Sequence, residues 1–354
     1  MYKPLIRLSM LALLMANSLS VAFAADPPRT ASSVKEIALY QGPDRQARLV
    51  DAARKEGELS IYNAAPVEDL QPIANAFTRK YGVKVKFWRA SSEGVLRRVL
   101  SEAQGGRLEV DIVENNAPEN EALHRENLLQ EVRSPYVGEL IPQASPAHKE
   151  WVASAYDVFV VAYNTNKVRK EDLPRTYQDL TDPKWKGSLG IEAEDQGWLA
   201  TLMEGMGEPQ GLKLFNEIAT KNGFSVRKGH SLLANLVASG EVPLALTAYN
   251  WKPMQLKEKG APIEWFTLSP TIAQFRTIAM TRRAPHPHAA VLFYDFMLSE
   301  GQALLASRSL VPTSKKTDFP LARVEVKFID PVRALDLQEK WTRTYDEVIV
   351  KHAR

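Results

Sequence analysis

Strand and helix signals alternate near the start of the chain, and this alternation restricts the possible folds more than any other feature. Apolar residues at every second position predict strands, and apolar residues at helical spacing predict helices. The predicted order is strand 58–63, helix 66–81, strand 83–88, helix 91–105 and strand 110–113. Helices that connect consecutive strands in this way are typical of a parallel sheet covered by helices.

The rest of the chain continues the same pattern. An apolar run at 156–163, broken only by Asp157, predicts a buried strand that crosses between two lobes. Further strands are expected at 189–192, 242–248, 263–268 and 277–280, and helices at 44–56, 196–206, 211–222, 231–239, 288–298, 300–307 and 335–351. The 354 residues suffice for two domains of ordinary size. The sequence therefore predicts an α/β fold with two lobes, in which ligands bind where strands end and helices begin.

The first 24 residues have the features of a cleaved signal peptide. Lys3 and Arg7 precede an apolar run at 8–14, and Ala-Phe-Ala at 22–24 places small residues where signal peptidase reads the chain. We predict cleavage before Ala25 and a mature protein in the periplasm. The apolar run is shorter than the ~20 residues of a membrane span. An uncleaved signal anchor is the alternative.

Charge and cysteine content exclude several classes of protein. Of the 45 basic residues, two lie in the first 24 positions, so the mature chain carries 43 basic against 42 acidic side chains. This balance gives no electrostatic footprint for nucleic acid. The chain has no cysteine, which excludes a lipoprotein anchor, disulfide bonds and thiolate chemistry.

Eight short stretches, taken in their order and spacing, resemble one known family. They are EGELSIY (56–62), FTRKYGVKV (77–85), SSEGVLRR (91–98), AYNT (162–165), YQDLTDPKWKG (177–187), ASGEVP (238–243), HPHAA (286–290) and EGQ (300–302). With these stretches the chain resembles the periplasmic solute-binding proteins of ABC importers, extracellular solute-binding family 1. The resemblance is to the branch that includes ferric-ion-binding proteins and relatives for small anionic solutes.

This resemblance implies a two-lobe periplasmic binding protein fold of type II, with mixed sheets, flanking helices and a ligand cleft between the lobes. We expect a loosely held lead-in at 25–44, a first lobe from 45–152 and 264–300, and a second lobe from 153–263 and 301–354. The family also implies a monomer without a cofactor. Such a protein binds a small molecule and passes it to a permease in the inner membrane.

Candidate ligand contacts in the first lobe follow its predicted strands. Asn63 ends the first strand and could present its amide to the cleft, although a turn residue is the alternative. Ser91 and Ser92 precede a helix, where a hydroxyl caps free N–H groups or binds an anion together with them. The resemblance favours binding, because serines at this place line the cleft in the family. Asn115 and Asn116 follow the third strand and have the same placement.

Candidate contacts in the second lobe begin with a group of carboxylates. Glu192, Glu194 and Asp195 follow a predicted strand and precede a helix. Carboxylates there could bind a cation or the ammonium group of a ligand. Capping of the following helix is the alternative for Asp195.

The segment Tyr249, Asn250, Trp251 and Lys252 ends a strongly apolar strand and is the most informative candidate. In the ferric branch this region carries adjacent tyrosines that hold the metal, and our alignment places Trp251 and Lys252 there. Neither replaces a phenolate, so we expect no metal site, and Tyr249 becomes a metal ligand only if the alignment shifts. Lys252 suits a carboxylate, phosphate or phosphonate, and Trp251 offers an aromatic wall. A solvated lysine and a packing tryptophan are the alternatives.

Arg276, His286 and His288 are weaker candidates. Arg276, in a predicted strand, is a candidate for an anion, although arginines in such strands usually face solvent. His286 and His288 resemble a metal pair, but a proline separates them and no third ligand lies nearby in the sequence. We expect a structural role for both histidines.

Enzyme signatures were sought as the rival class. The chain has no Gly-x-Ser-x-Gly elbow, no His-Glu-x-x-His motif and no Walker loop. We therefore predict a non-enzymatic periplasmic component of an ABC transporter that captures a small anionic solute. A ferric-iron-binding protein is the alternative, and a secreted hydrolase is a remote one.

Overall fold

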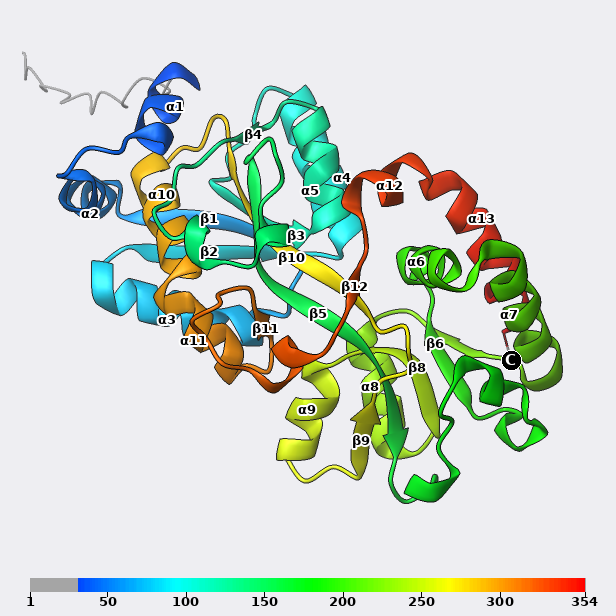
Figure 1. Ribbon diagram of the computed structural model, residues 1–354. Coiled ribbons are helices and arrows are strands. Elements are labelled where there is room, and N and C mark those ends of the chain that lie inside the picture. Colours follow the sequence, from blue (N-terminus) through cyan, green and yellow to red (C-terminus); the bar gives the residue numbers. More distant parts are fainter. Residues whose placement is uncertain (1–30, 354) are drawn as a thin grey trace, which may run out of the picture.

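The computed structural model describes residues 31–353 and arranges them in two α/β lobes joined by shared strands (Figure 1). The predicted signal peptide and its cleavage site lie outside the described residues. Within residues 31–353, no helix combines the length and the apolar character that crossing a membrane requires.

The sheet of the first lobe has the strand order β2-β1-β3-β10-β5. β1 pairs in parallel with β2 and β3, as the alternation predicts, whereas β10 runs antiparallel to β3 and β5. Three short strands pair with this sheet at β10 and β5. The strands are β1 (Glu58–Asn63), β2 (Lys84–Arg89), β3 (Ile112–Asn116), β4 (Leu129–Gln130), β5 (Trp151–Asn164), β10 (Ile272–Thr281), β11 (Val311–Pro312) and β12 (Lys327–Phe328).

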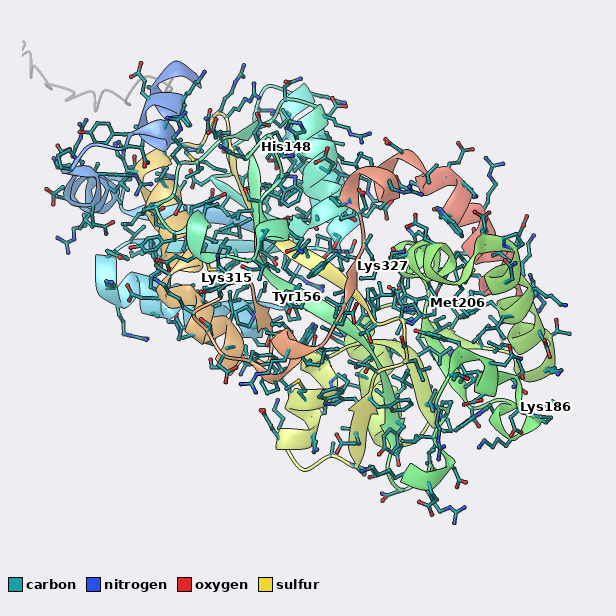
Figure 2. The ribbon with its side chains drawn as sticks, viewed as in Figure 1. His148, Tyr156, Lys186, Met206, Lys315 and Lys327 are labelled. Atoms are coloured by element: carbon teal, nitrogen blue, oxygen red, sulfur yellow. The ribbon has the colours of Figure 1, made fainter. Side chains whose placement is uncertain are left out.

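The sheet of the second lobe uses the far half of β5. β8 (Leu244–Tyr249) and β9 (Ile263–Phe266) pair antiparallel to β5. β6 (Leu189–Glu192) then pairs in parallel with β8 and with β7 (Ser225–Arg227). All residues of β5 are buried, because the strand passes through both lobes and is covered throughout. Tyr156 lies on β5 between the lobes (Figure 2).

Helices cover both sheets. The first lobe carries α1 (Ala31–Leu39), α2 (Arg45–Glu56), α3 (Val67–Tyr81), α4 (Ser92–Gln104), α5 (Ala117–Arg125), α10 (Pro287–Leu298) and α11 (Glu300–Ser307). The second lobe carries α6 (Gln196–Met206), α7 (Glu208–Asn222), α8 (His230–Ser239), α9 (Trp251–Glu258) and α13 (Gln338–Val348). α12 (Pro331–Asp336) contacts α5 in one lobe and α13 in the other, so the C-terminal segment crosses from lobe to lobe (Figure 1).

Short 3₁₀ turns complete the connections. They are Val137–Glu139, Pro142–Ala144, Lys170–Asp172, Tyr177–Thr181, Pro183–Trp185, Pro320–Arg323 and Val350–His352. Two of the helices in the first lobe end at a glycine. Gly57 and Gly82 follow α2 and α3 with φ angles of 76° and 79°, a left-handed conformation that glycine adopts without strain.

Four sequence-based expectations about elements are wrong. The lead-in contains α1, because Val34 and Ala38 are four residues apart and bury their side chains against the first lobe. β10 begins at Ile272 rather than 277, since pairing with β5 extends it. The expected final helix divides into α12 and α13 around Leu337. α11 and β11 pack on the first lobe through α10, α3 and β5, although residues from 301 onward were expected in the second.

Candidate functional site

A cavity of about 770 Å³ lies between the two lobes. Its wall in the first lobe includes the beginnings of α4 and α5, and its wall in the second lobe includes the beginnings of α6 and α8 and the end of β8. The C-terminal segment of α12 and α13 adds part of the rim. Nine of the sequence-predicted residues line this cavity: Ser91, Ser92, Asn116, Glu192, Glu194, Asp195, Tyr249, Trp251 and Arg276.

The first-lobe wall is a set of polar groups at helix beginnings. Ser91 caps α4, with its Oγ accepting the N–H of Gly94 at 3.2 Å. Ser92 Oγ accepts a hydrogen bond from Asn116 Nδ2 at 2.8 Å, which ties α4 to the start of α5. Asn115 Nδ2 donates to the backbone oxygen of Ser92 at 3.0 Å. The serines therefore cap and connect the helices as well as line the cavity.

Four predicted contacts lie outside the cavity wall. Asn63 is fully buried and donates to the backbone oxygen of Ala65 at 2.7 Å. Asn115 is likewise used by the backbone. Asn250 accepts the N–H of Val158 at 2.9 Å and donates to a backbone oxygen on the α11–β11 connection. In each case the amide satisfies buried backbone groups, and this requirement takes precedence over ligand contact.

Lys252 is the fourth residue outside the wall. β8 ends at Tyr249 and α9 begins at Trp251, so Lys252 is already the second residue of a helix. Its ammonium nitrogen lies 5.9 Å from the ring centre of Trp251, and Lys252 is not among the cavity-lining residues. The expectation that Lys252 binds an anion is therefore not supported by this geometry.

A buried ion-pair network forms the floor of the cavity. Arg276 Nε donates to Asp157 Oδ2 at 2.7 Å, and Arg276 Nη1 lies 3.7 Å from Glu114 Oε1. The guanidinium carbon also lies 5.6 Å from the ring centre of Trp251. Burial raises the pKa of Asp157, an effect that the adjacent guanidinium opposes. Arg276 is buried and lines the cavity, so the alternative of a solvent-facing arginine is wrong, and its role as a contact for an anion stays a prediction.

Glu192, Asp195, His230 and Tyr249 form a compact cluster on the second-lobe wall. Donor atoms of Glu192, Asp195 and His230 all lie within 4.8 Å of one another. His230 Nε2 is 3.3 Å from Asp195 Oδ1, and its Nδ1 is 2.9 Å from the backbone oxygen of Thr247. The Tyr249 ring stacks on His230 with 3.6 Å between ring centres.

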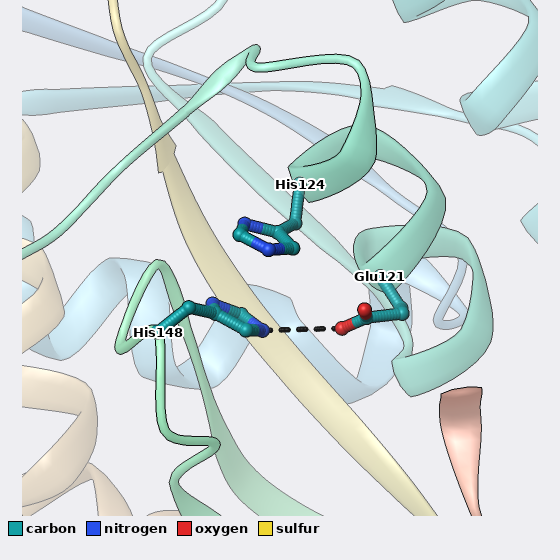
Figure 3. A group of neighbouring side chains, drawn as sticks. All are labelled: Glu121, His124 and His148. Atoms are coloured by element: carbon teal, nitrogen blue, oxygen red, sulfur yellow. Dashed lines mark hydrogen bonds and ion pairs between the residues drawn. The ribbon is translucent and has the colours of Figure 1, made fainter.

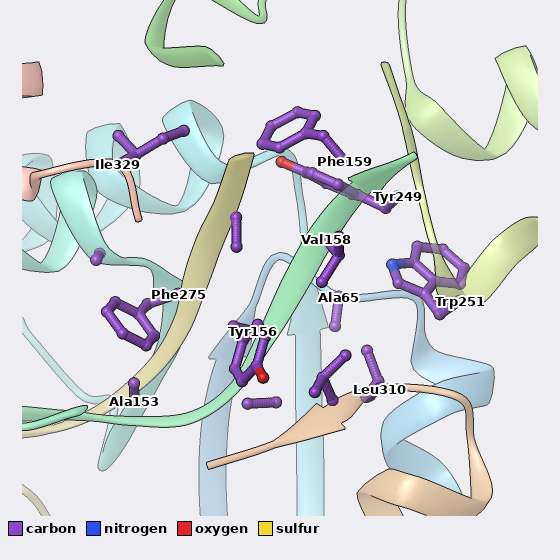
Figure 4. Close-up of a cluster of buried hydrophobic side chains, with 14 of the residues drawn as sticks. Ala65, Ala153, Tyr156, Val158, Phe159, Tyr249, Trp251, Phe275, Leu310 and Ile329 are labelled. Atoms are coloured by element: carbon purple, nitrogen blue, oxygen red, sulfur yellow. The ribbon is translucent and has the colours of Figure 1, made fainter. Parts of the chain in front are cut away.

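The neighbouring elements hold this cluster in place. Glu192 accepts backbone N–H groups from Gly229 at 2.7 Å and from Glu194. Asp195 Oδ2 is buried and has no hydrogen-bond partner among the described residues. Figure 4 shows the Tyr249 ring beside Phe159 of β5, which fixes its orientation. The arrangement leaves one buried acceptor atom of a cavity-lining residue without a hydrogen-bond partner among the described residues.

The protonation states in the cluster follow from burial and charge. Burial acts to lower the pKa of His230, but the carboxylates of Asp195 and Glu192 outweigh it and raise the pKa to about 9. Burial raises the pKa of the Tyr249 phenol well above its usual range. At neutral pH the cluster therefore holds an imidazolium and a neutral phenol.

Glu119 is a further carboxyl group on the first-lobe wall. Its Oε2 is buried and lacks a hydrogen-bond partner among the described residues. Burial raises its pKa to about 7, with smaller contributions from the charges of Glu93 and Glu194. Lys228 neutralises Glu194 through a contact of 2.6 Å.

Several of these residues were missed or undervalued by the sequence reasoning. His230 follows β7 and begins α8, but the short strand β7 was not predicted, so the rule that located Ser91 and Asp195 was not applied there. Asp157 and Arg276 lie inside apolar strands, and their pairing spans 119 positions, so no local pattern indicates it. The expectation for His286 and His288 is consistent with their contacts, which are to Asp111 and Glu56.

Comparisons with known proteins identify the class that this fold and cleft define. The family model for bacterial extracellular solute-binding proteins matches residues 116–330, more than half of the chain, and the protein belongs to this family. It is 25% identical to the major ferric iron-binding protein of Neisseria meningitidis serogroup B, over 85% of this chain and 92% of that protein. It is 26% identical to the Fe(3+)-binding periplasmic protein of Serratia marcescens, over 60% and 62%.

Solved structures share the fold. Iron-bound HitA from Pseudomonas aeruginosa superposes with a TM-score of 0.72 at 21% identity, covering 82% of this chain and 99% of that one. The periplasmic binding protein AfuA from Actinobacillus pleuropneumoniae, with fructose-6-phosphate bound, gives 0.73 at 23% identity, covering 83% and 99%. The chain is thus a non-enzymatic solute-binding protein of an ABC importer, in the branch that includes ferric-iron-binding proteins.

Proposed function

We propose that this protein captures ferric iron in the cleft and delivers it to an inner-membrane permease. The observation that carries the proposal is the cluster of Glu192, Asp195 and His230, whose donor atoms lie within 4.8 Å of one another on one wall of the cavity, with the Tyr249 ring stacked on His230. Carboxylate and phenolate oxygens are hard ligands, and hard trivalent cations prefer them. The relatives named for ferric iron support the same choice.

The charges of the cluster suit a trivalent cation. The carboxylates of Glu192 and Asp195 supply two negative charges, and the Tyr249 phenol supplies a third once it loses its proton. Asp195 Oδ2, which has no hydrogen-bond partner in the part of the chain that the structure describes, would gain one by binding an ion. The imidazole of His230 contributes a neutral nitrogen after it releases its proton to solvent.

The opposite wall accounts for closure of the lobes. The beginnings of α4 and α5 lie at the cavity, and Ser91 and Ser92 line it there. A small anion or water held there would complete the coordination of an ion bound by the second lobe. Contacts made to both lobes favour the closed form, which is the form a permease would recognise.

This proposal reverses the preference drawn from the sequence. The expectation of an anionic cargo depended on Lys252 together with Ser91 and Ser92, and of these three residues only the serines line the cavity. The wall instead carries the acidic residues Glu93, Glu114, Glu119, Glu192, Glu194, Asp195 and Asp346 against Arg89, Lys228, Arg276 and His230. An excess of acidic groups favours a cation.

A phosphorylated or carboxylated organic solute is the second candidate. The cavity volume of about 770 Å³ exceeds what a single ion needs and is typical of small-molecule pockets. The structure of AfuA with fructose-6-phosphate shares the fold. In this case the beginning of α4, with Ser91 and Ser92, would hold the anionic group.

The test is titration of the metal-free protein with ferric nitrilotriacetate, followed by visible absorption and metal analysis. The proposal predicts one iron per chain and a phenolate-to-iron absorption band. Tyr249→Phe should abolish the band. Tyr163→Phe is the matched control, because Tyr163 is a buried tyrosine of β5 that does not line the cavity. This variant should keep the absorption band. Binding of a sugar phosphate without any iron uptake would favour the second candidate.

A further inference from the structure

A second cluster of metal-ligating side chains lies on the first lobe, outside the cavity. Glu121 and His124 project from α5, and His148 lies in the segment that precedes β5 (Figure 3). Donor atoms of the three side chains lie within 4.8 Å of one another. The two imidazole rings stack with 3.6 Å between their centres, and His148 Nε2 is 3.1 Å from Glu121 Oε2. None of the three residues lines the cavity.

A second layer of groups orients these side chains. His124 Nδ1 lies 2.7 Å from Glu150 Oε2, so its N–H points to the carboxylate and its Nε2 lone pair is left for another partner. Arg282 Nη2 holds the other oxygen of Glu150 at 2.8 Å. Trp151 Nε1 donates to Glu121 Oε2 at 3.2 Å. In protein metal sites, a ligating histidine commonly donates its other N–H to a carboxylate, and a ligating carboxylate accepts a hydrogen bond from a neighbouring donor.

We propose that Glu121, His124 and His148 bind one divalent transition-metal ion of the zinc class. Two imidazoles and a carboxylate suit Zn²⁺, Ni²⁺ or Cu²⁺ better than the hard ions Mg²⁺ and Ca²⁺. Three protein ligands leave a fourth position for water. The side chains of His124 and His148 are 29% and 20% exposed, which gives an ion a path from solvent.

The site has a definite structural consequence. His148 belongs to the segment that leads into β5, whereas the other two ligands belong to α5, so an ion would fasten the helix to the start of the strand that joins the lobes. Two existing interactions oppose binding. An ion lies in the plane of each imidazole that binds it, so the stacked rings of His124 and His148, whose planes differ by 10°, must turn to share one ion. The N–H of Glu150 donates to His148 Nδ1 at 3.1 Å, and an ion at Nε2 requires a proton on Nδ1. We therefore expect weaker binding than in a closed four-ligand zinc site.

The experiment uses the full mature chain without a histidine tag, in a His230→Gln background. That substitution removes the imidazole from the cleft cluster. Zinc binding at the second site is therefore measured independently of whether the cleft of the wild-type protein binds iron. Zinc chloride is titrated by calorimetry, and Co²⁺ serves as a spectroscopic probe because its visible bands report a low-coordinate nitrogen and oxygen site. We expect one Zn²⁺ or Co²⁺ per chain.

Variants of the cluster decide the result. His124→Gln or His148→Gln should lower zinc affinity by more than about 100-fold, and Glu150→Gln by about 10-fold. If a histidine variant fails to fold, Glu121→Gln replaces it in the test. This variant keeps an acceptor for Trp151 Nε1 but loses the carboxylate, so it should also lower zinc affinity. The control is the double change His286→Gln and His288→Gln, a partly exposed pair elsewhere on the lobe, which should have no effect. Absence of zinc uptake, or uptake that the cluster variants leave unchanged, overturns the proposal.

Discussion

The stability of this protein should fall as pH rises through neutrality because of Glu119. The folded protein holds this carboxyl with a pKa of about 7, whereas its ordinary value is 4.5. Between these two values the folded state binds a proton that the unfolded state has released, so raising the pH disfavours folding. A shift of that size corresponds to at most about 3 kcal/mol, since each pKa unit is worth about 1.4 kcal/mol.

The assay is urea denaturation at about pH 5 and about pH 8. Glu119→Gln has no proton to lose at this position. From about pH 5 to about pH 8 the wild type should therefore lose up to about 3 kcal/mol of unfolding free energy relative to this variant. Glu126→Gln, an exposed residue that follows the same helix, is the control and should keep the wild-type pH dependence. Parallel pH profiles for the wild type and Glu119→Gln would refute the reasoning.

Three further predictions follow from the cleft. Arg276→Met should lower the unfolding free energy by about 3–5 kcal/mol, because Asp157 stays buried without its cation; a loss below about 1 kcal/mol in urea denaturation would contradict this. Lys252→Ala should leave the affinity for ferric nitrilotriacetate unchanged, since the residue lies outside the cavity wall; a large loss by calorimetry would return it to the site. Iron affinity should rise with pH, by up to about tenfold per unit for each proton released from Tyr249 and His230, and a flat profile in competition titrations would exclude both as ligands.

Much of the fold could be predicted because local patterns dictate it. The alternation over 58–113 gave the parallel part of the first sheet, since strand periodicity and short connections leave few topologies. The same logic located the cavity. Ser92 and Asp195 were found because side chains at strand ends and helix beginnings meet at one edge of a sheet.

The rest depended on contacts between distant parts of the chain. Asp157 and Arg276 are paired through the β5–β10 register, which also sets Tyr156 opposite Phe275. Asn250 looked like a ligand contact but satisfies buried backbone groups that only the packed structure reveals. The zinc-class cluster joins His124 to His148 across 24 positions without a motif spacing.

The metal content of the protein purified from the bacterial periplasm tests the central claim most directly. The same sample is measured by elemental analysis and by native mass spectrometry, so that an ion and an organic ligand are both detected. The account predicts iron at one per chain, lost when Tyr249 and His230 are replaced together. A retained organic anion with no iron would contradict it and would assign the cleft to a solute held at Ser91 and Ser92.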